Sequence, residues 1–338
     1  MKKILMIVGV LSLLIGASNV FAQANFYEGK TIRFIVGFPA GGGYDAYTRT
    51  IARHMGKHIP GNPTMVVDNM PGAGSMISAN YVFKIAKPDG LTIGHFIGGL
   101  FLQQILGKPG IEFDAAKFQY IGVPGQDNFI LGISKATGIA DVDSWLASKQ
   151  VVKFGGVASG SGSDDIPNIL KATIGLPLQL VSGYKGTADV RLAFNSGEVM
   201  GLSNSWESTK STWRKELESG DLRIVLQATL KPHPEFPKLP MALSYAKTDE
   251  AKRLISTVQK VHGASVRPYV LPPNTPTDRL QIIRKAFMDT MKDPEFLAEA
   301  KKANLDINPD DGTVLEQNVK EILKLEPALV AKLKEILK

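Results

Sequence analysis

Three glycine-rich segments have the residue types of a binding site for an anion. They are Pro39-Ala-Gly-Gly-Gly-Tyr-Asp45, Gly155-Gly-Val-Ala-Ser-Gly-Ser-Gly-Ser-Asp164 and Ser182-Gly-Tyr-Lys-Gly-Thr-Ala-Asp189. Each follows a run of strand-forming residues and precedes a helical pattern. The first N–H groups of a helix lack partners within it, and its N-terminus carries about +0.5 of an effective charge. Because glycine lets a ligand oxygen approach that backbone, the pattern predicts anion binding beyond the carboxyl ends of strands.

A single segment of this kind is also typical of an ordinary strand-to-helix turn with an Asp or Ser cap. For each turn taken alone, this second interpretation stays open. The occurrence of three such turns favours one shared cleft.

The turns do not carry the residues of the common nucleotide-binding motifs. A phosphate-binding P-loop needs Gly-Lys followed by Ser or Thr, whereas Gly43 is followed by Tyr44. Pro71-Gly-Ala-Gly74 begins like a dinucleotide fingerprint, but Ile77 stands where its third glycine belongs. We therefore expect no cofactor.

Motifs for catalysis are equally weak. His54 and His58 have the spacing of a zinc helix, but Met55 takes the place of its glutamate, so we interpret both histidines as solvated helix residues. The Ser-x-x-Lys pattern occurs at 182–185 and again at 244–247, which shows how little it discriminates. Since no nucleophile can be paired with a base, we expect neither an enzyme nor a metal site.

Composition and charge limit the class of protein. The chain has 338 residues, of which 44% are hydrophobic and 21% charged, so it can bury a core in one large or two ordinary domains. The formal net charge of +7 comes from scattered basic residues, which is compatible with a small anionic ligand and does not indicate nucleic acid binding. There is no cysteine.

The N-terminus has the pattern of a secretory signal peptide. Lys2 and Lys3 precede an apolar run, and small residues follow before Ala22 and Ala24. We therefore expect a soluble, periplasmic monomer. A membrane-tethering helix is the alternative.

Strand and helix patterns alternate along the chain. Strand patterns at 31–38, 64–70 and 92–98 alternate with helix patterns near 44–58 and 74–86, which predicts βαβ units and a parallel sheet. The rhythm restarts after residue 124, with helices near 163–174, 187–196 and 207–219 and a last strand at 222–229. A proline-rich connector covers 231–240, and amphipathic helices follow at 276–292, 293–303 and 312–337.

This order predicts an α/β protein with two lobes, each a mainly parallel sheet flanked by helices. We assign residues 1–24 to the signal peptide, 25–124 and 231–338 to lobe 1, and 125–230 to lobe 2. Lobe 2 is thus inserted into a lobe built from both ends of the mature chain.

The turns and their flanks resemble the Bug/TctC family, the periplasmic substrate-binding proteins of tripartite tricarboxylate transporters. The resemblance runs from about Tyr27 to Ile322 and is carried by Pro-Ala-Gly-Gly-Gly-x-Asp, Asn-x-Pro-Gly-Ala-Gly and Tyr-Lys-Gly in order and spacing. It implies a two-lobe, type II (Venus-flytrap) binding protein whose lobes close on the ligand. Such a protein captures a small carboxylated solute and delivers it to a permease with one large and one small integral membrane subunit.

The resemblance also implies which turns face each other across the cleft. In that family they hold a ligand carboxylate through backbone groups and ordered water. The matching ligand-binding positions of this chain are Phe38, Pro39, Ala40, Gly41, Gly42, Gly43, Tyr44, Asp45, Ser159, Gly160, Ser161, Gly162, Ser163, Asp164, Tyr184, Lys185, Gly186, Thr187, Ala188 and Asp189.

The ligand itself stays open between a dicarboxylate, a tricarboxylate, an aromatic acid and other solutes. Tyr44 stands where the commonest form of the family has a small hydroxyl residue, and its phenol can stack on a ligand. Asp45 and Asp189 either cap their helices or face the cleft, where they would repel a second carboxylate. Two other functions are alternatives: a sensor that delivers the solute to a membrane receptor kinase, and a secreted hydrolase.

Overall fold

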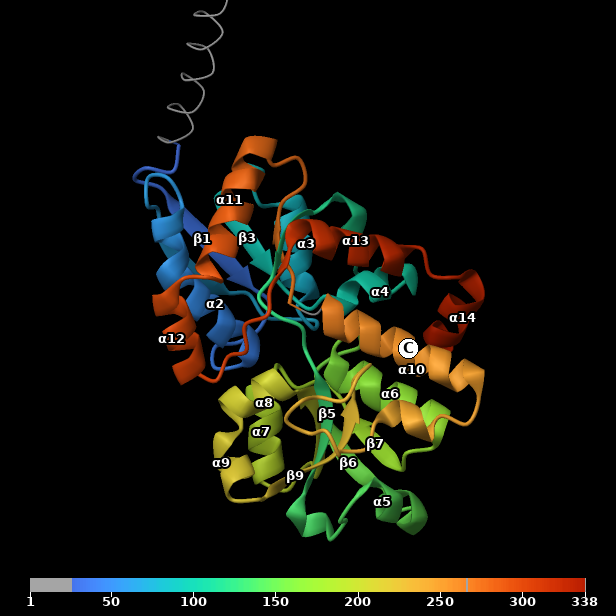
Figure 1. Ribbon diagram of the computed structural model, residues 1–338. Helices are drawn as coiled ribbons and strands as arrows, with labels where there is room; N and C mark the ends of the chain where they lie inside the picture. The colour runs from blue at the N-terminus through green and yellow to red at the C-terminus, as the bar shows by residue number, and fades with distance from the viewer. Residues whose placement is uncertain (1–25, 266, 338) are drawn as a thin grey trace, which may run out of the picture.

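The computed structural model describes residues 26–265 and 267–337, so the expected signal peptide lies outside the described residues. Over these two ranges the strands form two separate sheets, and helices flank each sheet (Figure 1). Both sheets are mixed rather than mainly parallel as expected, because β10 (Tyr269–Leu271) and β11 (Asp310–Asp311) in the first sheet and β5 (Phe129–Ser134) in the second run antiparallel to their neighbours. The chain otherwise has the α/β architecture with two lobes that its sequence predicts.

The first sheet contains strands from both ends of the described chain. Its strands are β1 (Thr31–Val36), β2 (Thr64–Asn69), β3 (Thr92–His95), β4 (Gln119–Val123), β10 (Tyr269–Leu271) and β11 (Asp310–Asp311), in the order β11-β4-β10-β3-β1-β2. β1 pairs in parallel with β2 and β3, as the βαβ pattern predicts, whereas β10 is antiparallel to β3 and β4. The returning chain thus inserts β10 between two strands formed much earlier in the sequence.

The second sheet comes from the middle of the chain. Its strands are β5 (Phe129–Ser134), β6 (Val152–Gly155), β7 (Leu178–Val181), β8 (Gly201–Ser205) and β9 (Leu222–Ala228), in the order β7-β6-β8-β5-β9. β6 is parallel to β7 and β8, and β5 is antiparallel to β8 and β9. The lobe boundaries proposed from the sequence stay a prediction.

The helix patterns of the sequence correspond to helices, but two of them are interrupted. The helices are α2 (Gly43–Met55), α3 (Met76–Lys84), α4 (Gly99–Ile105), α5 (Val142–Ser148), α6 (Gly162–Ile174), α7 (Thr187–Asn195), α8 (Trp206–Thr212), α9 (Arg214–Glu218), α10 (Asp249–Ala264), α11 (Thr277–Thr290), α12 (Pro294–Lys302), α13 (Gly312–Leu323) and α14 (Pro327–Ile336). Trp213, fully buried against Phe194, divides the helix expected at 207–219. Pro327 divides the one expected at 312–337, because a proline holds the preceding residue extended and favours the first position of a new helix.

The sequence patterns do not indicate α10, which connects the two halves of the molecule. The Thr248 hydroxyl caps it by accepting the N–H of Ala251 at 3.1 Å. Its buried apolar face, which includes Leu254 and Val258, packs against α6. In Figure 1, α10 crosses between the two sheets, and the chain then continues into β10 of the first sheet.

Both sheets direct glycine-rich turns toward the same region. β1, β6 and β7 each end in such a turn, and the turns lead into α2, α6 and α7. The core fixes these junctions: on the first sheet, Phe34 of β1, Ile51 of α2 and Phe287 of α11 belong to one buried apolar cluster. The apolar core therefore anchors the β1 junction, and all three turns lie at carboxyl ends of strands, where ligands bind in open α/β sheets.

Candidate functional site

A cavity of about 60 Å³ lies where the turns of the two sheets meet. One buried water needs roughly 10–15 Å³ of such space, so the cavity suits a small solute rather than a peptide. Its walls come from distant parts of the sequence. They are formed by Phe38, Pro39, Gly42, Gly43, Tyr44, Ile97, Asp127, Phe129, Val157, Ser161, Gly162, Ser163, Gly186, Thr187, Ala188, Asp189, Asn204, Ser205, Ser208, His262 and Arg267.

Three helices begin at this cavity without a side-chain cap. The residues before α2, α6 and α7 are Gly42, Ser161 and Gly186, and none of them makes a capping hydrogen bond through its side chain. The first N–H groups of each helix have no acceptor within the helix, and the helix dipole places positive potential there. The arrangement therefore offers an anion several backbone donors from both sheets.

The three consecutive glycines of the first turn serve different purposes. Gly41 has φ +86°, a conformation that glycine adopts without strain. Gly42 has φ −94°, but a Cβ there would lie 3.3 Å from Thr187 Oγ1 of α7. At Gly43 a Cβ would lie 2.1 Å from Ser208 Oγ of α8. The second and third glycines therefore let the two sheets approach each other.

The structure brings many of the sequence-predicted site residues together and leaves others outside the cavity. Those in its wall are Phe38, Pro39, Gly42, Gly43, Tyr44, Ser161, Gly162, Ser163, Gly186, Thr187, Ala188 and Asp189. Those that do not line it are Ala40, Gly41, Asp45, Ser159, Gly160, Asp164, Tyr184 and Lys185. Their role in ligand binding stays a prediction.

Asp45 holds the first turn in place from inside the protein. Its carboxylate accepts the N–H of Gly41 at 3.1 Å and hydrogen bonds from Arg49 and Asn69 at 2.9 Å each. Burial raises the pKa of Asp45, but the hydrogen bonds from Arg49, Asn69 and Gly41 outweigh burial and hold the pKa below its usual value. Asp45 therefore remains charged and positions the glycines.

Asp164 holds the turn before α6 in place through hydrogen bonds, as Asp45 holds the first turn. It accepts the N–H of Val157 at 2.6 Å and hydroxyl hydrogen bonds from Ser161 and Ser182. Burial raises its pKa. Its side chain is almost fully buried and shapes the turn from behind the cavity wall.

The other residues outside the wall have local partners or face solvent. The Ser159 hydroxyl donates to the carbonyl of Leu337 at 3.0 Å, and the Tyr184 hydroxyl donates to Glu198 at 2.6 Å. Lys185 is exposed, and its backbone N–H donates to Asp189 at 3.3 Å.

Sequence reasoning missed the buried ion pair of the cavity. Arg267 Nε donates to Asp127 Oδ1 at 2.7 Å, and Nη2 donates to the hydroxyls of Ser208 at 2.7 Å and Ser205 at 3.1 Å. No motif marks these residues, because Asp127 and Arg267 are 140 positions apart. The one signal in the sequence that could have pointed to the pair is a basic residue, Arg267, just after α10, a helix that the sequence patterns do not indicate.

Burial and mutual attraction act in opposite directions on the two members of this pair, and the net pKa of Asp127 is raised. Burial raises the pKa of Asp127, and the Arg267 charge opposes that increase. For Arg267, burial lowers the pKa, but the charge of Asp127 outweighs it and the pKa is raised. Glu207 lies behind the pair, where burial and then the Asp127 charge raise its pKa to about 8. The surroundings of Arg267 are thus rich in carboxyl groups.

His262 was also missed, and it forms part of the cavity wall from α10. Its Nε2 lies 3.1 Å from Asp165 Oδ2, and its ring meets Phe129 edge-on at 5.8 Å between centroids. The segment from α10 to β10 therefore supplies two polar side chains, His262 and Arg267, to the cavity.

A family model for tripartite tricarboxylate transporter family receptors (TctC) matches residues 47–334. The chain belongs to this family. Among curated relatives, a UPF0065 protein in the gbd 5' region of Cupriavidus necator is 25% identical over 317 residues, which cover 92% of this chain and 90% of that protein. A UPF0065 protein in the tcbD-tcbE intergenic region of Pseudomonas sp. (strain P51) is 24% identical over 219 residues, 63% of this chain and 62% of that one.

Solved structures of other proteins share the fold of this chain. The periplasmic binding protein BugD superposes with a TM-score of 0.74 at 21% identity and covers 92% of this chain and 100% of its own. MatC from Rhodopseudomonas palustris, with bound malate, gives a TM-score of 0.71 at 18% identity over 91% of this chain and 99% of its own. Rpa4515 from R. palustris, with adipate, gives a TM-score of 0.72 at 21% identity and covers 91% of this chain and 98% of its own.

Residues 26–265 and 267–337 contain no helix with the length and apolar character needed to cross a bilayer. The family and fold of this chain are those of solute-binding proteins.

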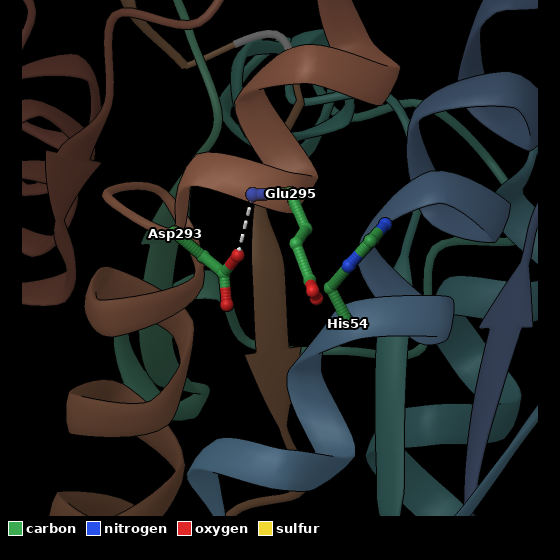
Figure 2. Close-up of side chains that lie close together, drawn as sticks. All are labelled: His54, Asp293 and Glu295. Atoms are coloured by element: carbon green, nitrogen blue, oxygen red, sulfur yellow. Dashed lines mark hydrogen bonds between the residues drawn. The ribbon is translucent and has the colours of Figure 1, made fainter.

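One cluster of side chains has the residue types of a metal site. Figure 2 shows His54 of α2 beside Asp293 and Glu295 at the start of α12. The ammonium of Lys57 already lies 2.7 Å from Asp293 and 2.6 Å from Glu295, and His54 Nε2 lies 2.6 Å from Glu299. Ion pairs therefore join α2 and the residues just after it to α12, and the Lys57 ammonium already contacts both carboxylates of the cluster.

This network corrects the expectation that His54 and His58 are solvated. Both are partly buried, and His58 Nε2 lies 2.8 Å from Asp293. Both side chains contact the α12 segment: His54 of α2 reaches Glu299, and His58, which follows α2, reaches Asp293 at the start of α12.

Proposed function

We propose that this chain is an extracytoplasmic solute-binding protein that captures a small carboxylated organic anion in the cavity between its lobes. It delivers the solute to a tripartite tricarboxylate-type transporter with one large and one small integral membrane subunit. It acts as a monomer in the periplasm after removal of residues 1–24. Family membership supports this proposal, as do the malate and adipate held by two proteins of the same fold.

The observation that carries the proposal is the convergence of three uncapped helix N-termini on one small cavity. α2 follows a strand of the first sheet, and α6 and α7 follow strands of the second sheet. A carboxylate accepts charge-assisted hydrogen bonds from such N–H groups, and these are stronger than neutral ones. A solute that contacts both lobes binds the closed state better than the open state and so favours closure.

Calorimetric titration with succinate, malate, adipate and citrate, together with small-angle scattering, tests this function. At least one of these acids should bind, and its addition should lower the radius of gyration because the lobes close. The diamide of the acid that binds tightest serves as the control and should not bind. Binding of none of the acids would contradict the proposal, and tight binding with unchanged scattering would contradict the closure mechanism.

Deletion of the gene in its native host tests delivery to a transporter. Uptake of the radiolabelled acid should be lost and should return with the wild-type gene. If uptake persists while a transcriptional response to the acid disappears, the protein instead serves as a sensor for a membrane receptor kinase.

A further inference from the structure

Arg267 has one guanidinium nitrogen that its described neighbours leave unoccupied. Nε is used by Asp127, and Nη2 is used by Ser205 and Ser208. Nη1 has no hydrogen-bond partner among residues 26–265 and 267–337, although Arg267 is only 1% exposed. A guanidinium presents five N–H groups in a fixed plane, and leaving buried ones unpaired is unfavourable. Nη1 is therefore a donor in need of an acceptor.

The neighbours of Arg267 fix where this donor lies. The guanidinium carbon lies over the ring of Tyr44 at 4.8 Å and over the ring of Tyr47 at 4.6 Å, measured to the ring centroids. A Cβ at Gly43 would stand 3.4 Å from Nη1. Since Gly43 and Arg267 both line the cavity, the missing side chain at Gly43 leaves Nη1 beside the N-terminus of α2.

The charges in the cavity give this donor a specific role. Asp127 and Asp189 also line the wall, so a carboxylate that enters the cavity comes close to two other carboxyl groups. Arg267 is the cation that opposes Asp127 directly. A second acidic group on a solute can be tolerated here if a guanidinium N–H receives it.

We propose that Nη1 of Arg267 binds an acidic group of the solute beside the N-terminus of α2, and that the N-termini of α6 and α7 bind a second one. The solute class is accordingly a small dicarboxylate. This inference rests on the proposed function and adds to it the solute class and the residue that selects it.

Arg267 also neutralises Asp127, so a test must separate the two roles. Replacing Arg267 alone would leave a buried carboxylate unpaired, which strongly destabilises proteins. The double substitution Arg267→Gln with Asp127→Asn removes both charges together. Arg279→Gln is the matched control, because Arg279 stacks on Phe26 and donates to the carbonyl of Asp89 outside the cavity.

Calorimetric titration compares succinate, malate and adipate with their monomethyl esters. The wild type should prefer the best-bound dicarboxylate over its ester by roughly tenfold or more, since one charge-assisted hydrogen bond is lost. In the double variant only the N-termini of α6 and α7 still bind an acidic group. The dicarboxylate and its monomethyl ester each supply one such group, so their affinities should agree within about threefold. Arg279→Gln should keep the wild-type preference.

A folded double variant that retains the full preference, even with weaker binding overall, would show that Arg267 only neutralises Asp127. A wild type that binds no carboxylate would refute the proposed function rather than this inference. A crystal structure of the wild type with the bound dicarboxylate does not depend on the folding of a variant. It should place an acidic oxygen within about 3.2 Å of Nη1. A bound dicarboxylate that makes no contact with Nη1 overturns the inference.

Discussion

At the residue scale, adjacent glycines of the first turn meet different surroundings. Gly43 is helical and faces Ser208 of α8 so closely that any Cβ would collide with its hydroxyl. Gly42 has an ordinary φ and more room beside Thr187. The need for glycine at these two positions therefore arises from the approach of the second lobe and not from the backbone conformation.

Substitution of Gly43 by alanine should weaken solute binding with little effect on stability. Overpacking costs about 1–3 kcal/mol, so the affinity should fall by roughly tenfold to a hundredfold because the closed state is obstructed. Gly42→Ala, the matched control, should lose less affinity. Calorimetry and thermal unfolding of both variants measure the difference. Equal affinities for the two variants would mean that Ser208 does not limit closure.

Asp45→Asn should reduce stability at neutral pH and remove part of its dependence on pH. The folded-state pKa of Asp45 lies below its usual value of 3.8. Its contribution is therefore complete above that pH and is lost as the pH falls below it. Loss of the charged hydrogen bonds should cost about 1–3 kcal/mol at pH 7. Urea unfolding at pH 7, 4 and 3 tests this, and a constant difference between variant and wild type would contradict it.

At the element scale, α10 decides how the halves of the molecule are connected. It packs on α6 of the second sheet and leads directly to Arg267 and β10 of the first. α10 therefore links an element of the second sheet to residues of the cavity wall, His262 and Arg267. Its stability depends on its apolar face and on the Thr248 cap.

Thr248→Ala should lower the free energy of unfolding by about 0.5–2 kcal/mol, because the N–H of Ala251 loses its acceptor. Solute affinity should stay near that of the wild type. Thr257→Ala serves as the control, since this hydroxyl lies within the same helix and donates to the carbonyl of Arg253. Chemical denaturation measures both variants, and equal losses would argue against the capping role.

At the scale of the whole molecule, the two halves meet along a seam of small residues. A Cβ at Gly99 of α4 would lie 2.0 Å from the carbonyl oxygen of Gly160, and one at Gly74 would lie 2.6 Å from the Cβ of Ala158. Residues near 74 and 99 belong to the part of the chain that forms the first sheet, and residues 158–160 to the part that forms the second. Small residues along the seam therefore permit close contact between the lobes.

Gly99→Ala should preserve the open protein and prevent full closure. Gly99 does not have a positive φ, so alanine is compatible with its backbone, whereas the methyl group collides across the seam. Small-angle scattering should then show a smaller decrease in the radius of gyration when a saturating acid is added. Gly263→Ala, whose Cβ would meet the carbonyl oxygen of Asp127 at an ordinary 3.5 Å, is the control. Full closure of Gly99→Ala would disprove this role of the seam.

The sequence by itself determined the strand–turn–helix junctions that begin the cavity. Pro39 to Asp45 and Tyr184 to Asp189 are recognisable because runs of glycine, helix starts and strand residues are local properties of the backbone. The same local signals predicted β1 and α2 and carried the resemblance to the Bug/TctC family. They also led to the expectation that Asp45 either caps its helix or faces the ligand.

Only the tertiary structure decided what faces those turns. The approach of Ser208 to Gly43, the pairing of Asp127 with Arg267 and the inward position of Asp45 all join residues through packing. They depend on α10 crossing between the sheets and on β10 entering the first sheet between β3 and β4. A contact between residues 140 positions apart leaves no periodicity or spacing in the chain, because long-range packing and not local backbone preference creates it.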